Sequence, residues 1–208
     1  MVSIICLKWG TLYGPEYVNK LFNEIEKFVT IPYEFICFTD NNSGVSAPTY
    51  ALPDLKLEGW WNKLWLFNEN LPVQFNRIFY IDLDTVIFDN IDHILSNLVK
   101  RFYMLRDFYR STGFGSGLMS WDLNKEFYLW ELFQRHRNKP LQSLPGHGDQ
   151  GFIEVHANKP IHTFQEEFPG EVTSYKVHRI RDKVADGKIM CFHGIPRPHE
   201  VPGIWDKR

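Results

Sequence analysis

The stretch NRIFYIDLDTVIFDNID (residues 76–92) contains an apolar run that leads directly into two aspartates, Asp82 and Asp84. Ligands of open α/β sheets bind outside the carboxyl ends of the strands, so a strand that ends in carboxylates marks a candidate site. In extended geometry two side chains two residues apart point the same way, and such hard oxygen ligands suit Mg²⁺ or Mn²⁺. The stretch therefore predicts a cation or ligand site at the end of a middle strand.

The same aspartate pair allows two other interpretations. Asp82 can cap a turn while Asp84 is solvated, since a D-x-D arises often by chance. The pattern DLDTV also fits phosphatases in which the first aspartate is a nucleophile and the second an acid/base. A phosphatase would carry a later acidic G-D-x-x-x-D, but the residue four positions after Asp149 is Ile153.

Hydrophobic periodicity around this stretch predicts an α/β fold with a central, mostly parallel sheet flanked by helices. Buried strands are expected over residues 2–7, 33–39, 77–82, 102–107, 115–122 and 188–192. Helices are expected over residues 16–29, 59–72, 93–98, 124–138 and 149–158. Residues 140–148 are expected to form a loop, and no linker or repeat divides the chain, so 1–208 is predicted to be one domain.

Composition excludes several classes of protein. A formal charge of −2 and no basic stripe argue against nucleic acid as a partner. Three widely separated cysteines, Cys6, Cys37 and Cys191, are expected to be reduced and buried, which favours a cytoplasmic location. No apolar run approaches the roughly 20 residues of a membrane-spanning helix, so no transmembrane segment is expected.

Five motifs occur in an order that resembles a known family: NKLWLF (62–67), FYIDLDTVIF (79–88), GSGLMSWD (115–122), GHGDQGF (146–152) and CFHGIPRPHE (191–200). The set resembles the nucleotide-sugar-dependent glycosyltransferases of the GT-A fold, nearest the glycogenin-like, galactosyltransferase-like group (glycosyltransferase family 8-like). The likeness covers about residues 4–199. It implies a Rossmann-like GT-A domain with a nucleotide-binding half (about 1–85) and a sugar- and acceptor-binding half (about 86–208).

The resemblance implies transfer of a sugar from a UDP-sugar donor to a carbohydrate, glycolipid or protein acceptor, with retention of the anomeric configuration. It implies a Mn²⁺ (or Mg²⁺) ion bound by Asp82, Asp84 and His193. The chain departs from the family spacing H-x-x-G-x-x-K-P, because His193 directly precedes Gly194 and Cys191 occupies the expected histidine position. Arg197 replaces the phosphate-contacting lysine, which keeps a cation and adds a bidentate fork.

The resemblance also assigns substrate-binding and catalytic residues. It places Asp149 and Gln150 beside the anomeric carbon as the catalytic pair. It implies that the donor or acceptor is contacted by Lys8, Trp9, Gly10, Thr11, Tyr13, Asp40, Lys63, Asp82, Leu83, Ser116, Gly117, Gly194 and Arg197.

Structural roles remain open for several of these residues. Asp149 also suits a helix N-cap, and Lys63 a helix-surface lysine. Tyr13 could pack in the core, and Asp40 could form a turn. Gly117 could be required only for a tight turn and have no contact with substrate.

Two other functions remain alternatives. A nucleotidyltransferase acting on sugar phosphates also uses a Rossmann-like sheet and an acidic metal site, but LKWGTLYG (7–14) lacks the repeated glycines expected after its first strand. A non-catalytic module that binds nucleotide sugars or carbohydrates would have the same glycosyltransferase fold but would catalyse no reaction. The presence of Asp82, Asp84, Lys63, Asp149 and His193 argues against that module.

Overall fold

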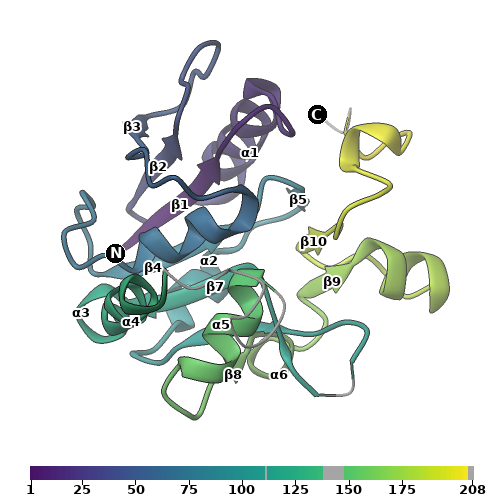
Figure 1. The fold of residues 1–208 in the computed structure, drawn as a ribbon. Coiled ribbons are helices and arrows are strands. Elements are labelled where there is room, and N and C mark those ends of the chain that lie inside the picture. Colours follow the sequence, from purple (N-terminus) through teal and green to yellow (C-terminus); the bar gives the residue numbers. More distant parts are fainter. Residues whose placement is uncertain (111, 138–147, 206–208) are drawn as a thin grey trace.

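The computed structural model describes residues 1–110, 112–137 and 148–205, and within them the strands form one seven-stranded and one three-stranded sheet (Figure 1). The large sheet has the order β3(Thr49–Ala51), β2(Tyr33–Thr39), β1(Val2–Lys8), β4(Arg77–Ile81), β7(Phe114–Asp122), β6(Tyr103–Arg106), β8(His162–Thr163). The small sheet has the order β5(Thr85–Ile87), β10(Ile189–Cys191), β9(Val172–Ser174).

The large sheet is mostly parallel. Strands β3, β2, β1 and β4 run parallel to one another, whereas β7 is antiparallel to both neighbours, β4 and β6. Strand β4 therefore lies at the boundary between the two arrangements. Its carboxyl end is the end from which the chain enters the aspartate pair.

Helices pack on both faces of the large sheet (Figure 1). The described α-helices are α1(Pro15–Phe28), α2(Asp92–Asn97), α3(Leu123–Glu126), α4(Tyr128–His136), α5(Gly148–His156) and α6(Phe164–Glu167). Tighter or wider helical turns are η1(Gly59–Phe67) and η4(Pro198–Glu200), both 3₁₀, and η3(Tyr175–Arg181), a π-helix.

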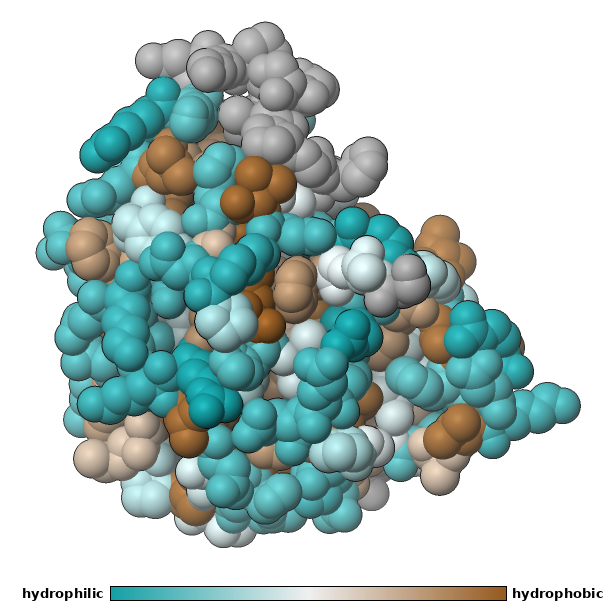
Figure 2. Space-filling view, turned by 90° about the horizontal axis from the view of Figure 1, so that it is seen from below, coloured by the Kyte–Doolittle hydropathy of each residue, from teal (hydrophilic) through white to brown (hydrophobic). Residues whose placement is uncertain are grey.

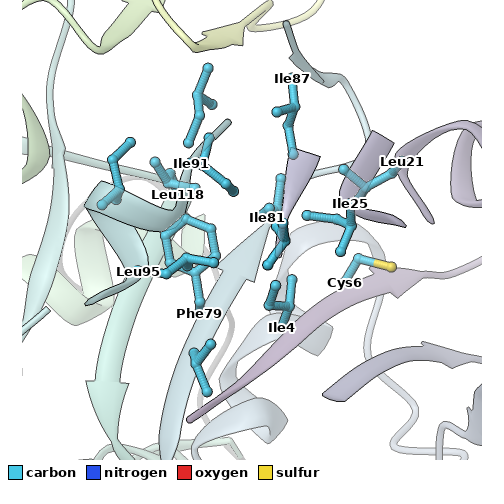
Figure 3. Packing of buried hydrophobic residues seen from close by; sticks show 14 of the residues in the cluster. Ile4, Cys6, Leu21, Ile25, Phe79, Ile81, Ile87, Ile91, Leu95 and Leu118 are labelled. Atoms are coloured by element: carbon cyan, nitrogen blue, oxygen red, sulfur yellow. The ribbon is translucent and has the colours of Figure 1, made fainter. Parts of the chain in front are cut away.

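Alternation along the strands divides the core into two apolar layers. Phe79 and Ile81 of β4 point to the layer that contains α1 and α2, which Figure 3 shows packed around the strand. Ile78 and Tyr80 point to the opposite layer, which contains η1, α4 and α5. Because successive side chains alternate between faces, the next residue, Asp82, belongs on the side of η1 and α5.

The predicted elements are largely confirmed, with three corrections. The helix expected over 59–72 is a 3₁₀ helix that ends at Phe67, where the amide of Asn68 bonds to the carbonyl of Trp65 three residues back. The long helix expected over 124–138 is interrupted at Phe127 and forms α3 and α4. The loop expected over 140–148 lies outside the described residues except for Gly148, which begins α5.

The cysteines and the surface agree with the composition. Cys6, Cys37 and Cys191 are free thiols and are buried, as predicted. On the face drawn in Figure 2, hydrophilic residues cover most of the surface and apolar residues form small separate groups. Among the described residues, no helix combines the length and apolar character needed to cross a bilayer.

Candidate active site

A pocket of about 970 Å³ opens at the carboxyl end of β4. Both halves of the chain contribute to it, since η1 and β4 come from the first half and β7, α5 and β10 from the second. The lining residues that the sequence predicted are Lys63, Asp82, Asp84, Ser116, Gly117, Asp149, Gln150 and His193. Chemistry-bearing residues from distant segments therefore meet in one cavity.

Asp82 is the centre of a charged cluster in this pocket. Its Oδ2 accepts a hydrogen bond from Nζ of Lys63 at 2.8 Å, and its Oδ1 accepts one from the hydroxyl of Tyr80. The Lys63 amine also lies 3.6 Å from Oδ2 of Asp149 and donates to Oγ of Ser116 at 3.4 Å. One cation from η1 thus lies between carboxylates from β4 and α5.

Burial and charge set the protonation of this cluster. Burial opposes the charge of Lys63, but the carboxylates of Asp82 and Asp149 outweigh it and hold the pKa of that amine above its ordinary value. Burial raises the pKa of Asp149, with the charge of Lys63 acting against the shift. The side chain of Lys63 is only 11% exposed, which rules out the helix-surface role that its sequence context also allowed.

Asp84 faces a different part of the chain. Its Oδ2 accepts hydrogen bonds from the hydroxyl of Tyr13 (3.2 Å) and from the amide of Gly194 (3.4 Å). The extended geometry expected for the pair is wrong, because the amide of Thr85 bonds to the carbonyl of Asp82 (3.1 Å) and makes the segment a turn. Burial, and next the charge of Asp82, raise the pKa of Asp84. A cation bound beside this carboxylate would counteract both effects and lower its pKa.

His193 presents an unpartnered nitrogen at the pocket. Its Nε2 is buried and accepts or donates no hydrogen bond among the described residues. Burial lowers the pKa of His193 to about 4, against the charge of Asp82, so the ring is neutral near pH 7. The backbone at His193 has φ of 57°, and its carbonyl accepts a hydrogen bond from Nζ of Lys176 (2.7 Å).

The donor set suits a divalent cation. Two carboxylates and a neutral imidazole with a free nitrogen are the ligand types that Mn²⁺ accepts. The described residues contain no group of three or more His, Cys, Asp or Glu side chains already close enough to hold a metal ion. Chemically, then, Asp82, Asp84 and His193 fit the ion that the sequence resemblance implies, although they do not form a preassembled cage.

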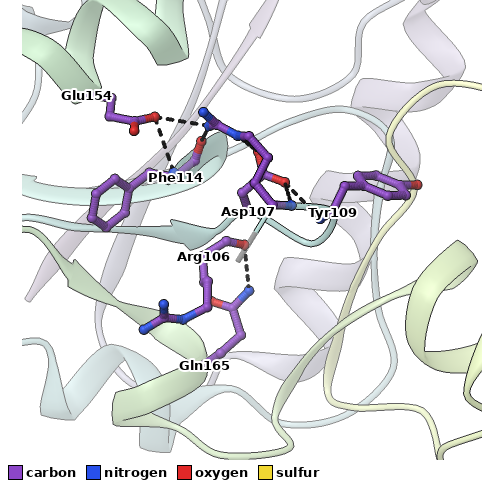
Figure 4. A network of polar contacts seen from close by, with 7 residues as sticks. Arg106, Asp107, Tyr109, Phe114, Glu154 and Gln165 are labelled. Atoms are coloured by element: carbon purple, nitrogen blue, oxygen red, sulfur yellow. Dashed lines mark hydrogen bonds and ion pairs between the residues drawn. The ribbon is translucent and has the colours of Figure 1, made fainter. Parts of the chain in front are cut away.

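The loop between β6 and β7 packs against His193. Phe108 packs its ring on His193, with ring centres 4.7 Å apart. Arg110 holds this loop, since its Nε donates to Oδ2 of Asp107 (2.7 Å) and its Nη2 to Oε2 of Glu154 (3.0 Å). The Glu154 carboxylate also accepts the amide of Phe114 (3.4 Å), as Figure 4 shows. Glu154 is on α5, so the loop is tied to the helix whose first turn enters the pocket.

The glycine-rich approach of β7 is needed for close packing against the aspartate. The carbonyl of Gly117 accepts the amide of Asp82 (2.9 Å), and a Cβ at Gly117 would lie 3.3 Å from Oδ2 of Asp82. Ser116 is buried and its hydroxyl faces Lys63. Both residues, for which substrate contact was predicted, therefore line the pocket.

A smaller pocket of about 290 Å³ lies beside the loop that follows β1. Trp9 and Asp40 line it, and Lys56 lines both pockets. Oδ2 of Asp40 accepts the amide of Gly10 (3.0 Å), so the ends of β1 and β2 are joined there. The structure thus brings together three residues that the sequence predicted, Trp9, Gly10 and Asp40.

Other predicted residues do not line either pocket. Leu83 packs in the apolar layer of α1, and Nζ of Lys8 donates to the carbonyl of Asn41 (3.3 Å). The guanidinium of Arg197 lies over the ring of Tyr13 at 5.4 Å. Thr11, Tyr13, Gly194 and Arg197 are likewise absent from the described pocket linings, although Tyr13 and Gly194 contact Asp84.

The two residues expected to be catalytic, Asp149 and Gln150, lie in the first turn of α5. Asp149 is the second residue of that helix, so its interpretation as the residue preceding the helix, the N-cap, is wrong. Gln150 lines the pocket beside it.

Sequence reasoning missed Tyr80, whose hydroxyl bonds to Asp82, and Trp60, which lines the pocket. Tyr80 lies two residues before Asp82 on the same strand, so strand alternation alone could have placed both on one face. Trp60 offered no such signal.

No protein-family model matches this chain, and no curated protein matches it. Solved structures do share its fold. Similarity to GlyE, a glycosyltransferase of Streptococcus pneumoniae TIGR4, has a TM-score of 0.67 and 10% identity over 94% of this chain and 55% of GlyE. Similarity to an active-site mutant of LgtC has a TM-score of 0.64 and 10% identity, over 94% of this chain and 89% of that one. The chain, about half the length of GlyE, thus has the α/β fold of GT-A glycosyltransferases.

Proposed function

We propose that this chain is a glycosyltransferase that transfers a sugar from a UDP-sugar to a hydroxyl group of an acceptor with retention of configuration. The observation that carries the proposal is the cluster of Lys63, Asp82 and Asp149 in a pocket at the carboxyl end of β4. A GT-A fold supports the proposal, because ligands of such sheets bind at this end of the strands.

Lys63 is suited to stabilise the leaving group. Cleavage of a sugar–diphosphate bond builds negative charge on the diphosphate, and a fixed cation stabilises that charge more in the transition state than in the ground state. The charge of Lys63 persists at any pH near neutrality, since its pKa is raised. Asp82 and Asp149 hold the amine in place.

The smaller pocket gives the donor a second anchoring point. Trp9 and Asp40 line a cavity of about 290 Å³ that shares Lys56 with the large pocket. We assign the uracil base to this pocket, where the Asp40 carboxylate would accept a hydrogen bond from N3–H. The ring of Trp9 would supply apolar contact area.

Retention is explained by a displacement on one face of the sugar. The C1–O bond to the diphosphate breaks while a bond forms between C1 and the acceptor oxygen. The acceptor proton then passes to the departing phosphate oxygen. Gln150 lines the pocket beside Asp149 and would orient the sugar, while no glutamate lines this part of the pocket among the described residues other than Glu58 on its rim.

A divalent cation, Mn²⁺ or Mg²⁺, belongs to the proposal. Asp82, Asp84 and His193 would hold it, and when bound it would act as a Lewis acid on the diphosphate oxygens. Tyr13 and Gly194 position the Asp84 carboxylate through their hydrogen bonds. The raised pKa of Asp84 marks a place where a positive charge is favoured.

A panel of UDP-sugars incubated with Mn²⁺ tests the proposal, with released UDP and the anomeric configuration of the product measured by NMR. We expect cleavage of at least one donor and a retained anomer. A nucleotidyltransferase would instead join UTP to a sugar 1-phosphate and release pyrophosphate. A binding module would be stabilised by UDP but would cleave no donor. Inversion of the product would contradict the displacement and would make Asp149 the candidate general base.

A further inference from the structure

Trp60 is an exposed aromatic side chain at the mouth of the large pocket. Its indole is 60% exposed, although the residue lies only three positions before the buried Lys63 on η1. The neighbouring Trp61 is different, because its ring stacks on Phe133 with centres 5.7 Å apart and an interplanar angle of 14°. Of the two adjacent tryptophans that line the pocket, Trp60 is the one with a large exposed surface.

The position of Trp60 is fixed at the α5 end of the pocket. A Cβ built on Gly148 would lie 2.4 Å from Nε1 of Trp60, so the edge of the indole rests directly on the first residue of α5. The next residue is Asp149, which lies 3.6 Å from the amine of Lys63. Trp60 does not line the smaller pocket of Trp9 and Asp40, which the proposed function assigns to the base.

Polar groups beside the indole suit a neutral ligand rich in hydroxyl groups. Glu58 also lines the mouth, and its carboxylate makes no hydrogen bond or ion pair within the described part of the chain. Lys56 also lines the pocket, but its amine is paired with Asp54, so the carboxylate of Glu58 stays uncompensated and disfavours an anionic ligand. A flat indole with an open face packs well against the C–H face of a pyranose ring, and a free carboxylate accepts its hydroxyl groups.

We propose that Trp60 is the platform on which the terminal pyranose ring of the acceptor stacks, with Glu58 accepting its hydroxyl groups. The acceptor is then a carbohydrate chain instead of a protein side chain. This assignment rests on the proposed function for its role in transfer, but the binding of a pyranose to Trp60 can be measured without any turnover.

Saturation-transfer NMR with methyl β-glucopyranoside, methyl β-galactopyranoside and methyl α-mannopyranoside, in the presence of UDP and Mn²⁺, tests the binding. We expect at least one probe to receive saturation at the ring protons of one face. The Kd should rise at least about fivefold in Trp60→Ala and less than twofold in Trp60→Phe, which keeps an aromatic face. The matched control is Ile180→Ala, because Ile180 is 56% exposed on η3 and lines neither pocket.

The outcomes separate this inference from the proposed function. Unchanged binding of the probes by Trp60→Ala, or no binding of any probe by the wild-type protein, overturns the platform. With a donor found, the platform also predicts a higher acceptor KM in Trp60→Ala while the KM for the UDP-sugar changes less than twofold. Binding of a probe through Trp60 without cleavage of any UDP-sugar would support the platform and overturn the proposed glycosyltransferase function.

Discussion

Nζ of Lys63 and Oδ2 of Asp82 lie 2.8 Å apart, one contributed by the 3₁₀ helix η1 and the other by the end of β4. The same amine lies 3.6 Å from Oδ2 of Asp149, the first turn of α5. One buried cation therefore balances two carboxylates that would otherwise repel each other. Lys63 thus links η1 with the end of β4 and with α5, and it supplies a buried positive charge to the pocket.

Replacement of this cation should affect both turnover and stability. In Lys63→Met we expect kcat for UDP-sugar cleavage to fall at least about a hundredfold, because the charge facing the diphosphate is lost. The free energy of unfolding should fall by about 3 kcal/mol, since the buried carboxylate of Asp149 and the partly buried one of Asp82 lose their partner. Urea unfolding and steady-state release of UDP measure the two effects.

Lys125→Met is the control for that substitution. The Lys125 side chain is 54% exposed on α3 and pairs with Asp122 at 3.9 Å, a surface pair worth less than about 1 kcal/mol. Wild-type kcat in Lys63→Met would exclude Lys63 from leaving-group stabilisation.

The role of Asp84 is tested by titration of Mn²⁺. We expect Asp84→Asn to raise the apparent Kd for Mn²⁺ at least about tenfold, because one of two charged ligands becomes neutral. The measurement is the thermal shift produced by UDP as a function of Mn²⁺ concentration. Asp182→Asn is the matched control, since Asp182 pairs with Arg181 on η3, outside the pocket. An unchanged titration in Asp84→Asn would remove Asp84 from the metal site.

The contact between Gly148 and Trp60 gives a second route to the acceptor platform. Gly148→Ala should displace the indole, since the new Cβ would lie 2.4 Å from Nε1 of Trp60, and should raise the acceptor KM as Trp60→Ala does. Gly170→Ala is matched in backbone strain, because Gly148 has φ of 66° and Gly170 φ of 79°, but its Cβ meets no atom within 4 Å. Both variants should lose about 1–2 kcal/mol of stability. A similar acceptor KM in the two would contradict the contact.

The free energy of unfolding should depend on pH through Asp92, the first residue of α2. Its carboxylate accepts hydrogen bonds from the amide and hydroxyl of Thr30 and from Nδ2 of Asn90 (3.0 Å). Burial is the largest single effect and opposes the charge, but the hydrogen bonds together outweigh it and hold the pKa of Asp92 below its ordinary value. Because the folded state has the lower pKa, the stabilisation is present above pH 3.8 and is lost as pH falls through the folded-state pKa.

Asp92→Ala is therefore expected to lose about 1 kcal/mol at pH 6.5 and less at pH 3. Urea unfolding at the two pH values measures the difference. Asp89→Asn is the control, because the Asp89 carboxylate accepts the amide of Asn90 (2.7 Å) and makes no other hydrogen bond or ion pair with the described residues. An equal loss for Asp92→Ala at both pH values would show that its charge has no role.

The fold was largely predictable because its signals are local. The run of apolar residues before Asp82 identifies β4, and alternation within it decides which layer each side chain enters. The meeting of Lys63 with Asp82 also follows, since η1 directly precedes β4 and covers that face. The family resemblance supplied the GT-A expectation, and the solved structures agree with it.

What the sequence missed depends on contacts between distant segments. The turn at Asp82–Thr85 redirects Asp84 toward Tyr13 and Gly194, and local spacing predicted an extended pair instead. The contact of Trp60 with Gly148 depends on where α5 begins, which periodicity does not fix. Helical spacing puts Trp61 on the apolar face, and its packing on Phe133 agrees, but that spacing did not predict that Trp60 lines the pocket.

The hydrogen bond from Gly194 to Asp84 spans 110 residues, and β5 pairs with β10 next to it. During synthesis the aspartate turn therefore leaves the ribosome long before the segment that completes it. Closing so large a loop is entropically slow, so this edge is expected to assemble late. A nascent chain would thus form much of the central sheet before the pocket at the end of β4 is complete, and this pocket reaches its final shape only after residue 194 has been synthesised.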